Sequence, residues 1–464
     1  MAVDYDLVVI GATTAGIQAA IAAADLKARV ALVTHGCTPA TGWDLAILQA
    51  GSAIAGDGQA VGALKPGLGW PKAAIANLEA LHSPAVLAHR GIDVITGMGE
   101  FCRKPVPALL AEGRQLRSRA YLLAVGCGSQ IPALAGLDTI AYLTLEQVLE
   151  QGPTVPPTYH WGIWGTDLRA IALAQALRQW GFPVTLFWAQ TADPVGGDRD
   201  VAGMLQAQMD AAGIAVCISP VCQVGAQGEQ TQIRLETRTL TVDRLVVVGA
   251  PLPNVAALNL AAMGIEGEPH RLHQSARLQT TNPRVYACLG QTEAGAFDHV
   301  ARYEAAIAVK NALFWPRFRA NYQALPFSLP TMPELAWVGL SEAQAHQQYG
   351  AEVQILVRAF NTVPAAQIRS DLTGWCKLLV RSNGKLLGAI AMGQEAAQII
   401  TLIAFAMQQN RTIQTLATLP IPTPAIAQIL NQLGQDWRSL SLGRQPRRED
   451  WLDSFFDWRR SWSR

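Results

Sequence analysis

The first 35 residues contain two continuous apolar runs, separated by a glycine-containing turn and an alanine-rich segment. Leu7–Ile10 and Val30–Val33 are short and uninterrupted, which is the pattern of strands buried on both faces of a parallel sheet. Ile17–Asp25, between them, suits a helix. This order predicts a βαβ unit whose turn can hold a pyrophosphate at the N-terminus of the helix.

The same pattern returns near Tyr159. A strand, a helix and a second strand are expected at Trp161–Trp164, Ile171–Trp180 and Val184–Phe187. The spacing from Gly11 to Val30 is 19 residues, as is that from Gly165 to Val184. This equal spacing predicts an internal repeat, and therefore two nucleotide-binding-type domains.

The rest of the chain continues as a mixed α/β pattern and changes character after about residue 326. Strands are expected at residues 92–95, 117–125, 244–248, 337–340, 352–357 and 376–380, and helices at 71–88, 303–314 and 396–407. The predicted fold class is α/β, with two Rossmann-like βαβ domains followed by an α+β domain.

Composition narrows the function classes. The chain has 464 residues and a net charge of +1, with 50% hydrophobic and 15% charged residues, so its charge gives no reason to expect binding to nucleic acid.

The uncharged span Leu7–Ala24 is long enough to mimic a membrane helix, but its glycine-threonine turn favours a buried strand and helix. Asp4 and Asp6 stand where a signal peptide has basic residues. Seven cysteines, an odd number, favour a reducing, cytoplasmic compartment.

The first glycine turn departs from G-x-G-x-x-G at one position. Gly11 and Gly16 are present, but Thr13 replaces the glycine that lets the backbone approach a phosphate. Thr34 replaces the acidic residue expected at the end of the second strand for ribose hydroxyls. The sequence therefore predicts a dinucleotide site that lacks two of the residues that usually favour binding.

The second turn is altered further. Asp167 takes the middle glycine position and would place a carboxylate beside a pyrophosphate, and Trp188 takes the ribose-acid position. Ala170 at the last position is small enough to be tolerated. We expect this domain to retain its fold but to bind NADH or NADPH negligibly.

These segments together resemble the pyridine nucleotide–disulfide oxidoreductases, the family of dihydrolipoamide dehydrogenase, glutathione reductase and mercuric reductase. The similarity runs from Tyr5 to about Gln428. The N-terminal turn, Ala124-Val125-Gly126 and Val285–Gln291 resemble the family's three FAD-contacting segments. Thr331–Leu340, Gly374–Val380 and Leu387-Gly388-Ala389 resemble motifs of its dimerisation domain.

The resemblance implies a cofactor, an oligomeric state and domain boundaries. It implies an FAD-binding-type domain at 1–150 and 270–325, a degenerate NAD(P)-binding-type domain at 151–269, and a dimerisation domain at 326–435 that forms a homodimer. The residues it assigns to FAD binding are Gly11, Ala12, Thr13, Ala15, Gly16, Thr34, Ala124, Gly126, Gly290 and Gln291.

The family's redox disulfide has no full counterpart here. Its C-x-x-x-x-C motif is represented only by Cys37, which resembles the second cysteine and is the one catalytic candidate, as a lone thiol. Cys217 and Cys222 have the right spacing, but they fall in the nicotinamide-type domain and are interpreted as structural thiols. No metal-binding motif is present.

The family's acid–base pair is also absent. The histidine and glutamate of H-P-T-x-x-E correspond to Ile421 and Ile426, and the glutamate that follows the second turn in relatives corresponds to Ala172. Neither proton transfer nor its orientation is available from these side chains.

Two functions from different classes remain. The first is a flavoprotein that keeps FAD for a different redox task, for example with a protein partner. The second is a cofactor-free pseudoenzyme that acts as a dimeric scaffold or as a binding subunit of an assembly.

The tail, residues 436–464, extends beyond the family's usual end and is rich in Trp and Arg. Trp451, Phe455, Trp458 and Trp462 recur at i, i+4, i+7 and i+11, which places them along one side of a helix. Two interpretations stay open: a helix that packs on its own domain, or a dock for a partner protein or a membrane surface.

Overall fold

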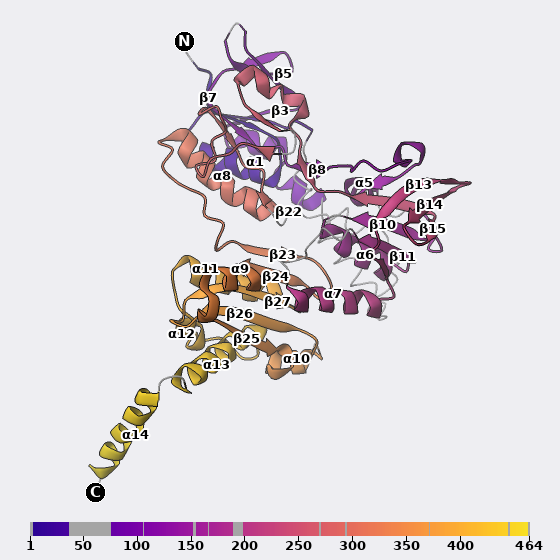
Figure 1. Ribbon diagram of the computed structural model, residues 1–464. Coiled ribbons are helices and arrows are strands. Elements are labelled where there is room, and N and C mark those ends of the chain that lie inside the picture. The colour runs from indigo at the N-terminus through magenta and orange to yellow at the C-terminus, as the bar shows by residue number, and fades with distance from the viewer. Residues whose placement is uncertain are drawn as a thin grey trace. The chain divides into compact units, whose positions relative to one another are not determined.

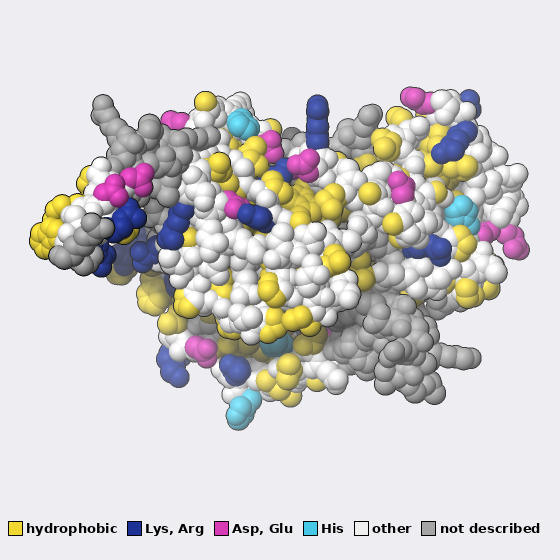
Figure 2. Space-filling view, turned by 90° about the horizontal axis from the view of Figure 1, so that it is seen from below, with side chains coloured by type: hydrophobic (Ala, Val, Ile, Leu, Met, Phe, Trp, Pro, Cys, Tyr) yellow, Lys and Arg dark blue, Asp and Glu magenta, His cyan; other side chains and the backbone are white. Residues whose placement is uncertain are grey.

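The computed structural model describes residues 3–36, 76–104, 106–151, 155–165, 167–188, 198–268, 271–292, 295–370, 372–443 and 446–462. The chain divides into two compact units, Met1–Ala192 with Met209–Asn321, and Asp193–Gln208 with Tyr322–Arg464. Figure 1 labels the helices and strands of both. In the face shown in Figure 2, hydrophobic side chains are scattered and charged ones are sparse, in keeping with a chain of which 15% is charged.

The first unit contains a parallel sheet in the order β20-β7-β1-β2-β3. Its strands are Val285–Ala287, Ser118–Leu123, Tyr5–Ile10, Val30–Val33 and Ile92–Ile95. Helices α1 (Thr14–Asp25) and α8 (Asp298–Leu313) enclose one apolar core with one face of the sheet. The other face packs against the antiparallel strands β4 (Gly99–Cys102), β5 (Ala108–Ala111) and β6 (Arg114–Leu116).

A second parallel sheet has the order β12-β11-β10-β16-β9. Its strands are Ala215–Cys217, Val184–Trp188, Trp161–Gly165, Arg244–Val248 and Leu143–Thr144, and helix α6 (Arg169–Gln179) links β10 to β11. Leu7 pairs with Val30, and Trp161 with Val184, 23 residues apart in both cases. The two sheets therefore repeat one register, and the predicted α/β fold class with two Rossmann-like βαβ units is confirmed.

Shorter elements complete the first unit. They are α4 (Pro84–His89), α5 (Leu145–Gln151), the sheet of β13 (Val221–Gln227), β14 (Gln230–Leu235) and β15 (Thr239–Val242), and the pairs β8 (Cys127–Ser129) with β17 (Pro251–Pro253), β18 (Gly267–Glu268) with β19 (Arg271–Leu272), and β21 (Gln291–Thr292) with β22 (Gly295–Ala296).

The second unit is built on an antiparallel sheet in the order β23-β24-β27-β26-β25. These strands are Pro326–Leu329, Leu335–Gly339, Leu386–Met392, Trp375–Arg381 and Val353–Ala359. The helices are α9 (Glu342–Tyr349), α10 (Pro364–Arg369), α11 (Ala396–Gln408), α12 (Ile413–Ala417), α13 (Ile429–Gly443), α14 (Pro446–Ser461) and most of α7 (Arg199–Ala211). Helix α11 buries Ile399, Ile400 and Ile403 in the core, as its apolar pattern predicts.

Two predicted helices differ from the structure. The helix expected at 71–88 is interrupted at 81–83, and α4 begins at Pro84. Proline has no N–H to continue a helix and favours an extended residue before it, and Ser83 has φ −57° and ψ 152°. The helix expected from 303 begins five residues earlier, at Asp298, so His299 lies inside it rather than before it.

Candidate dinucleotide site

The site predicted at the first glycine turn lies where β1, β7 and β20 end, at the carboxyl-terminal edge of a parallel sheet. A Cβ atom on Gly11, which has φ +107°, would lie 2.2 Å from the carbonyl oxygen of Ala124, and one on Gly16 would lie 2.0 Å from the carbonyl oxygen of Gly11. Both contacts are with backbone and leave no room for a side chain. The two glycines hold the turn against the neighbouring strand.

Thr13 has a structural role that the sequence pattern did not reveal. It is the N-cap of α1, with extended backbone, and its Oγ1 accepts a hydrogen bond from Gly16 N at 3.2 Å. The same hydroxyl donates to the Ala124 carbonyl oxygen at 2.8 Å. The threonine side chain is therefore held against the protein, and it stabilises the helix start that a pyrophosphate would use.

Helix α1 presents the positive end of its dipole at this turn. Its first turn contains no acidic residue, and Ala12 and Ala15 are buried beside it. Backbone N–H groups at such an end bind anions. A pyrophosphate group therefore fits the N-terminus of α1.

Thr34 lies at the end of β2, but its hydroxyl is used within the chain. Gly97 N donates to Thr34 Oγ1 at 3.0 Å. The next residue, His35, is buried, and its Nδ1 accepts from Gly99 N at 3.0 Å. Burial lowers the pKa of His35, and a backbone hydrogen bond at Asn254 opposes this. The end of β2 is thus fixed to the segment after β3, and Thr34 itself offers no carboxylate to a ribose.

The other predicted FAD contacts lie at the same sheet edge. Gly126 follows Ala124 with φ +63°, and Gly290 has φ +65° with its N–H donated to the buried Glu304 carboxylate at 2.9 Å. Gln291 donates from Nε2 to the carbonyl oxygen of Pro251 at 3.1 Å. The fold therefore brings Ala124, Gly126, Gly290 and Gln291 to the edge that holds the first turn.

Asp298 also lies at this edge and was missed by the sequence analysis. Thr14, the first residue of α1, donates its hydroxyl to the Asp298 carboxylate, and Arg302 Nε lies 2.9 Å from the other carboxylate oxygen. Burial raises the pKa of Asp298, and Arg302 opposes the shift. The i, i+4 spacing of Asp298 and Arg302 was the available signal, but the helix had been predicted to start at 303.

The second turn differs from the expected arrangement. Asp167 does not stand as a free charge, because its Oδ1 accepts hydrogen bonds from Arg169 N at 2.9 Å and from Arg169 Nε at 2.8 Å. The predicted charge repulsion is therefore largely cancelled by Arg169. The Trp188 ring lies 3.7 Å from where a Cβ on Gly165 would be. The Trp188 side chain thus lies beside Gly165, its partner on the neighbouring strand.

The cysteines in the described residues are free thiols. Cys37 lies outside the described residues. Burial raises the pKa of Cys127 to about 12, although Arg169 opposes it, and burial raises the pKa of Cys288 well above its ordinary value. Cys217 is buried in β12, and Cys222 is exposed within β13; both are free. Within the part of the chain that is described, no group of His, Cys, Asp and Glu could hold a metal ion.

The positions that correspond to the family's acid and base are apolar and packed. Ile426 is fully buried in the core of the second unit, and Ile421 packs partly against the same core. Ala172 is fully buried in α6. These side chains contribute packing and cannot transfer a proton.

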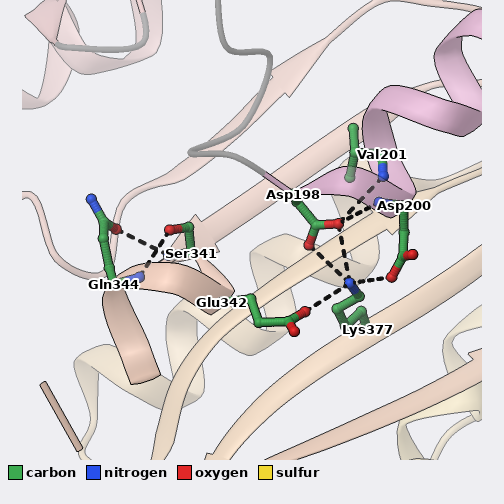
Figure 3. Close-up of polar contacts among 7 residues, drawn as sticks. All are labelled: Asp198, Asp200, Val201, Ser341, Glu342, Gln344 and Lys377. Atoms are coloured by element: carbon green, nitrogen blue, oxygen red, sulfur yellow. Dashed lines mark hydrogen bonds and ion pairs between the residues drawn. The ribbon is translucent and has the colours of Figure 1, made fainter. Parts of the chain in front are cut away.

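The second unit contains one buried ionic cluster (Figure 3). Lys377, on β26, lies 2.9 Å from Asp198, 2.6 Å from Asp200 and 3.1 Å from Glu342. The Lys377 and Asp198 side chains are 2% and 1% exposed. Burial alone would lower the pKa of Lys377, but the hydrogen bonds that its ammonium group donates to the three carboxylates outweigh burial and raise the pKa. Asp198 also accepts from the N–H groups of Asp200 and Val201 at 3.0 and 3.3 Å. The charges are paired, so the cluster is structural.

Two segments of the chain match known protein families. "Pyridine nucleotide-disulphide oxidoreductase" covers residues 5–303, and the dimerisation domain of the same family covers residues 325–433. The chain belongs to the pyridine nucleotide-disulphide oxidoreductase family. The match to the family's dimerisation domain supports the expected homodimer.

Mercuric reductases are among the similar proteins of this family. The enzyme of Staphylococcus aureus is 27% identical over 89% of this chain and 79% of its own length, and that of Streptomyces lividans is 27% identical over 94% and 96%. Similar solved structures include the HOCl-induced flavoprotein disulfide reductase RclA from Escherichia coli (TM-score 0.80, 21% identity, 93% of this chain and 99% of that one) and LpdA from Mycobacterium tuberculosis (TM-score 0.81, 20% identity, 93% and 99%). These structures support the fold.

Proposed function

We propose that this member of the family is an FAD-binding flavoprotein that does not reduce disulfides by a dithiol mechanism. The observation that carries the proposal is the contrast between two regions. The first turn keeps both glycines close to backbone atoms, and α1 begins with a capped N-terminus whose own first turn contains no acidic residue. The family's acid and base positions are occupied by Ile421 and Ile426.

FAD fits the residues present at its phosphate-binding end. The N-terminus of α1, between Gly11 and Gly16, would hold the pyrophosphate, and the segments at Ala124–Gly126 and Gly290–Gln291 would line the rest. When bound, FAD would supply the capacity to accept electrons from one donor and pass them to another. The chain contributes binding and orientation here, and apart from Cys37 we assign no residue to catalysis.

NADH and NADPH are not part of the proposal. Trp188 takes the ribose-acid position and lies beside Gly165, and Ala172 takes the position of the family's glutamate. Electrons would then come from a protein partner, in a cytoplasmic compartment, as the cysteine content suggested.

A cofactor-free dimeric scaffold is the second candidate, and two observations favour it. Asp298 places a carboxylate one hydrogen bond from the first residue of α1, and the Thr34 hydroxyl is occupied by Gly97. A negative charge near the pyrophosphate weakens dinucleotide binding, and the ribose has no acidic partner.

Cofactor content separates the two candidates. Freshly purified flavoprotein should be yellow and should release FAD on denaturation, identified by chromatography, and should fail to consume NADPH with a disulfide substrate. A colourless protein that also ignores added FAD in calorimetry would leave the scaffold. Disulfide reduction driven by NADH or NADPH would refute both.

We propose that the C-terminal tail, residues 436–464, is a docking element. Helix α14 carries Trp451, Trp458 and Trp462 at 60%, 52% and 73% exposure, and neighbouring aromatic rings contact one another along it. Rings this exposed leave apolar surface that a partner protein or a membrane surface can cover. Among the described residues, no helix is long and apolar enough to cross a bilayer.

Deletion of residues 445–464 tests the tail. A truncated protein that remains a stable dimer in sedimentation but leaves a complex or membrane fraction supports the dock. Loss of solubility or of the dimer shows that the helix is structural.

A further inference from the structure

A second aromatic surface lies on the first unit, at the C-terminal end of α8. It consists of Lys310, Phe314, Trp315, Arg317, Phe318 and Arg319, which we name the 310–319 platform. Trp315 is 73% exposed, Phe314 55% and Phe318 43%. Exposed aromatic rings that lie this close together along a chain mark an interaction site rather than ordinary surface.

The platform is held rigidly, although its rings face solvent. The buried Asn311 side chain accepts a hydrogen bond from Phe318 N at 3.0 Å and donates to the carbonyl oxygens of Phe318 and Arg277 at 2.8 and 3.0 Å. Asn321 N donates to the hydroxyl of Tyr303 at 2.9 Å. The exposed rings therefore stand on a fixed loop, and little conformational entropy is lost when they are covered.

The charges of the platform have one sign. Residues 305–333 contain no Asp or Glu, and residues 271–292, which include the Arg277 segment packed against the loop, contain none either. Lys310 Nζ lies 5.5 Å from the Phe318 ring centroid and Arg317 6.0 Å from it. Among the described residues, none of the three platform cations has an ion-pair partner. At the end of α1, which packs on α8, Asp25 and Lys27 cancel each other.

The platform is distant from the dinucleotide site. Helix α8 has 16 residues, so its two ends are about 24 Å apart at 1.5 Å per residue. The N-terminal end lies beside Thr14 and the platform follows the C-terminal end. This separation argues against delivery of electrons through the platform and favours attachment.

We propose that the 310–319 platform attaches the protein to an anionic lipid surface. Rings that stand out from the surface can enter a soft interfacial layer without matching pockets, as Trp and Phe do at membrane interfaces. Unpaired cations beside them gain from the negative potential of acidic lipids. The alternative ligand is a rigid acidic protein, which would have to supply a pocket for each ring.

Co-sedimentation of the full chain with vesicles tests the proposal. The probe is phosphatidylcholine alone against phosphatidylcholine containing a minority of phosphatidylserine, at low and high salt. The wild type should bind the acidic vesicles, and salt should weaken the binding. W315A should weaken it by at least about tenfold, and K310Q/R317Q/R319Q should remove the preference for acidic vesicles.

Matched controls are available at other exposed positions. I218A removes an apolar side chain that is 50% exposed, and R234Q removes an exposed cation elsewhere. Both should bind as the wild type does, and all variants should keep the wild-type melting temperature because the altered side chains are exposed. The measurement should be repeated on the chain without residues 445–464, so that attachment by the tail is scored separately.

Three results would overturn the proposal. The first is a wild type that ignores acidic vesicles, and the second is W315A binding as tightly as the wild type. The third is binding to polyglutamate but not to vesicles, which would replace the lipid with an acidic protein partner.

Discussion

Replacement of Lys377 by methionine should destabilise the second unit strongly. Methionine keeps the aliphatic stem but leaves Asp198, which is 1% exposed, without its cation. Breaking a buried ion pair by removing one partner costs about 3–5 kcal/mol. Asp198 retains two backbone N–H donors, so we expect the lower end of that range, about 3 kcal/mol.

The other two carboxylates should matter less. The Asp200 side chain is 69% exposed and that of Glu342 is 37% exposed, and pairs of such exposure contribute about 0–1 kcal/mol. For a unit of this size, a loss of about 3 kcal/mol lowers the melting temperature by about 6–12 °C.

Scanning calorimetry of four variants measures these values. K377M should lower the transition of the second unit by the stated amount, D198N by a comparable amount, and the control E342Q by a small fraction of it. K377M/D198L should recover part of the loss, since it replaces the pair by apolar groups. A K377M transition within 2 °C of the wild type, or a K377M/D198L loss at least as large as that of K377M alone, would refute the reasoning.

Three further predictions concern the first turn. The pKa of Asp298 is raised in the folded state, so the protonated carboxyl stabilises the fold fully below the unfolded pKa, and this stabilisation is lost as the pH rises through the folded pKa. D298N should therefore raise the melting temperature at neutral pH, and the gain should shrink toward acid pH in parallel scans. No gain at any pH would contradict this. T13A should cost about 1 kcal/mol in urea denaturation, because it removes the cap on Gly16 N, and an unchanged midpoint would count against the cap. G11A, with a Cβ 2.2 Å from the Ala124 oxygen, should cost at least about 3 kcal/mol in the same assay, and a fully soluble variant of wild-type stability would show that the turn relaxes.

The repeated βαβ units could be predicted from the sequence because their information is local. Continuous apolar runs define buried strands, and the glycine spacing fixes the turn. Side-chain pairings were less accessible. The cap formed by Thr13 depends on the carbonyl oxygen of Ala124, which lies 111 residues away. The substitution of Thr13 was therefore visible in the sequence, but its structural role was not.

The errors at the second turn and at α8 have different causes. The Asp167 carboxylate was treated as a charge facing a ligand, while two residues later Arg169 supplies both a backbone and a guanidinium donor. A local hydrogen bond of this kind competes with any outward orientation. The predicted helix started at Tyr303, whereas α8 begins at Asp298, so the prediction left Asp298 outside the helix.

The contact between Lys377 and Asp198 joins residues 179 positions apart. It therefore affects which fragments of the chain can fold and when the unit can fold during translation. A C-terminal fragment starting at Tyr322 would contain β26 but not the short piece at 193–208 that belongs to the same unit. Such a fragment would leave Lys377 with Glu342 but without Asp198 and Asp200, so we expect it to be less stable than the whole unit even though a family domain begins near its first residue. During translation, Asp198 leaves the ribosome long before Lys377, and the unit cannot be completed until that strand has emerged. The segment from Tyr322 to the C-terminus is therefore not a complete structural unit by itself, because its buried ion cluster includes a residue from the first half of the sequence.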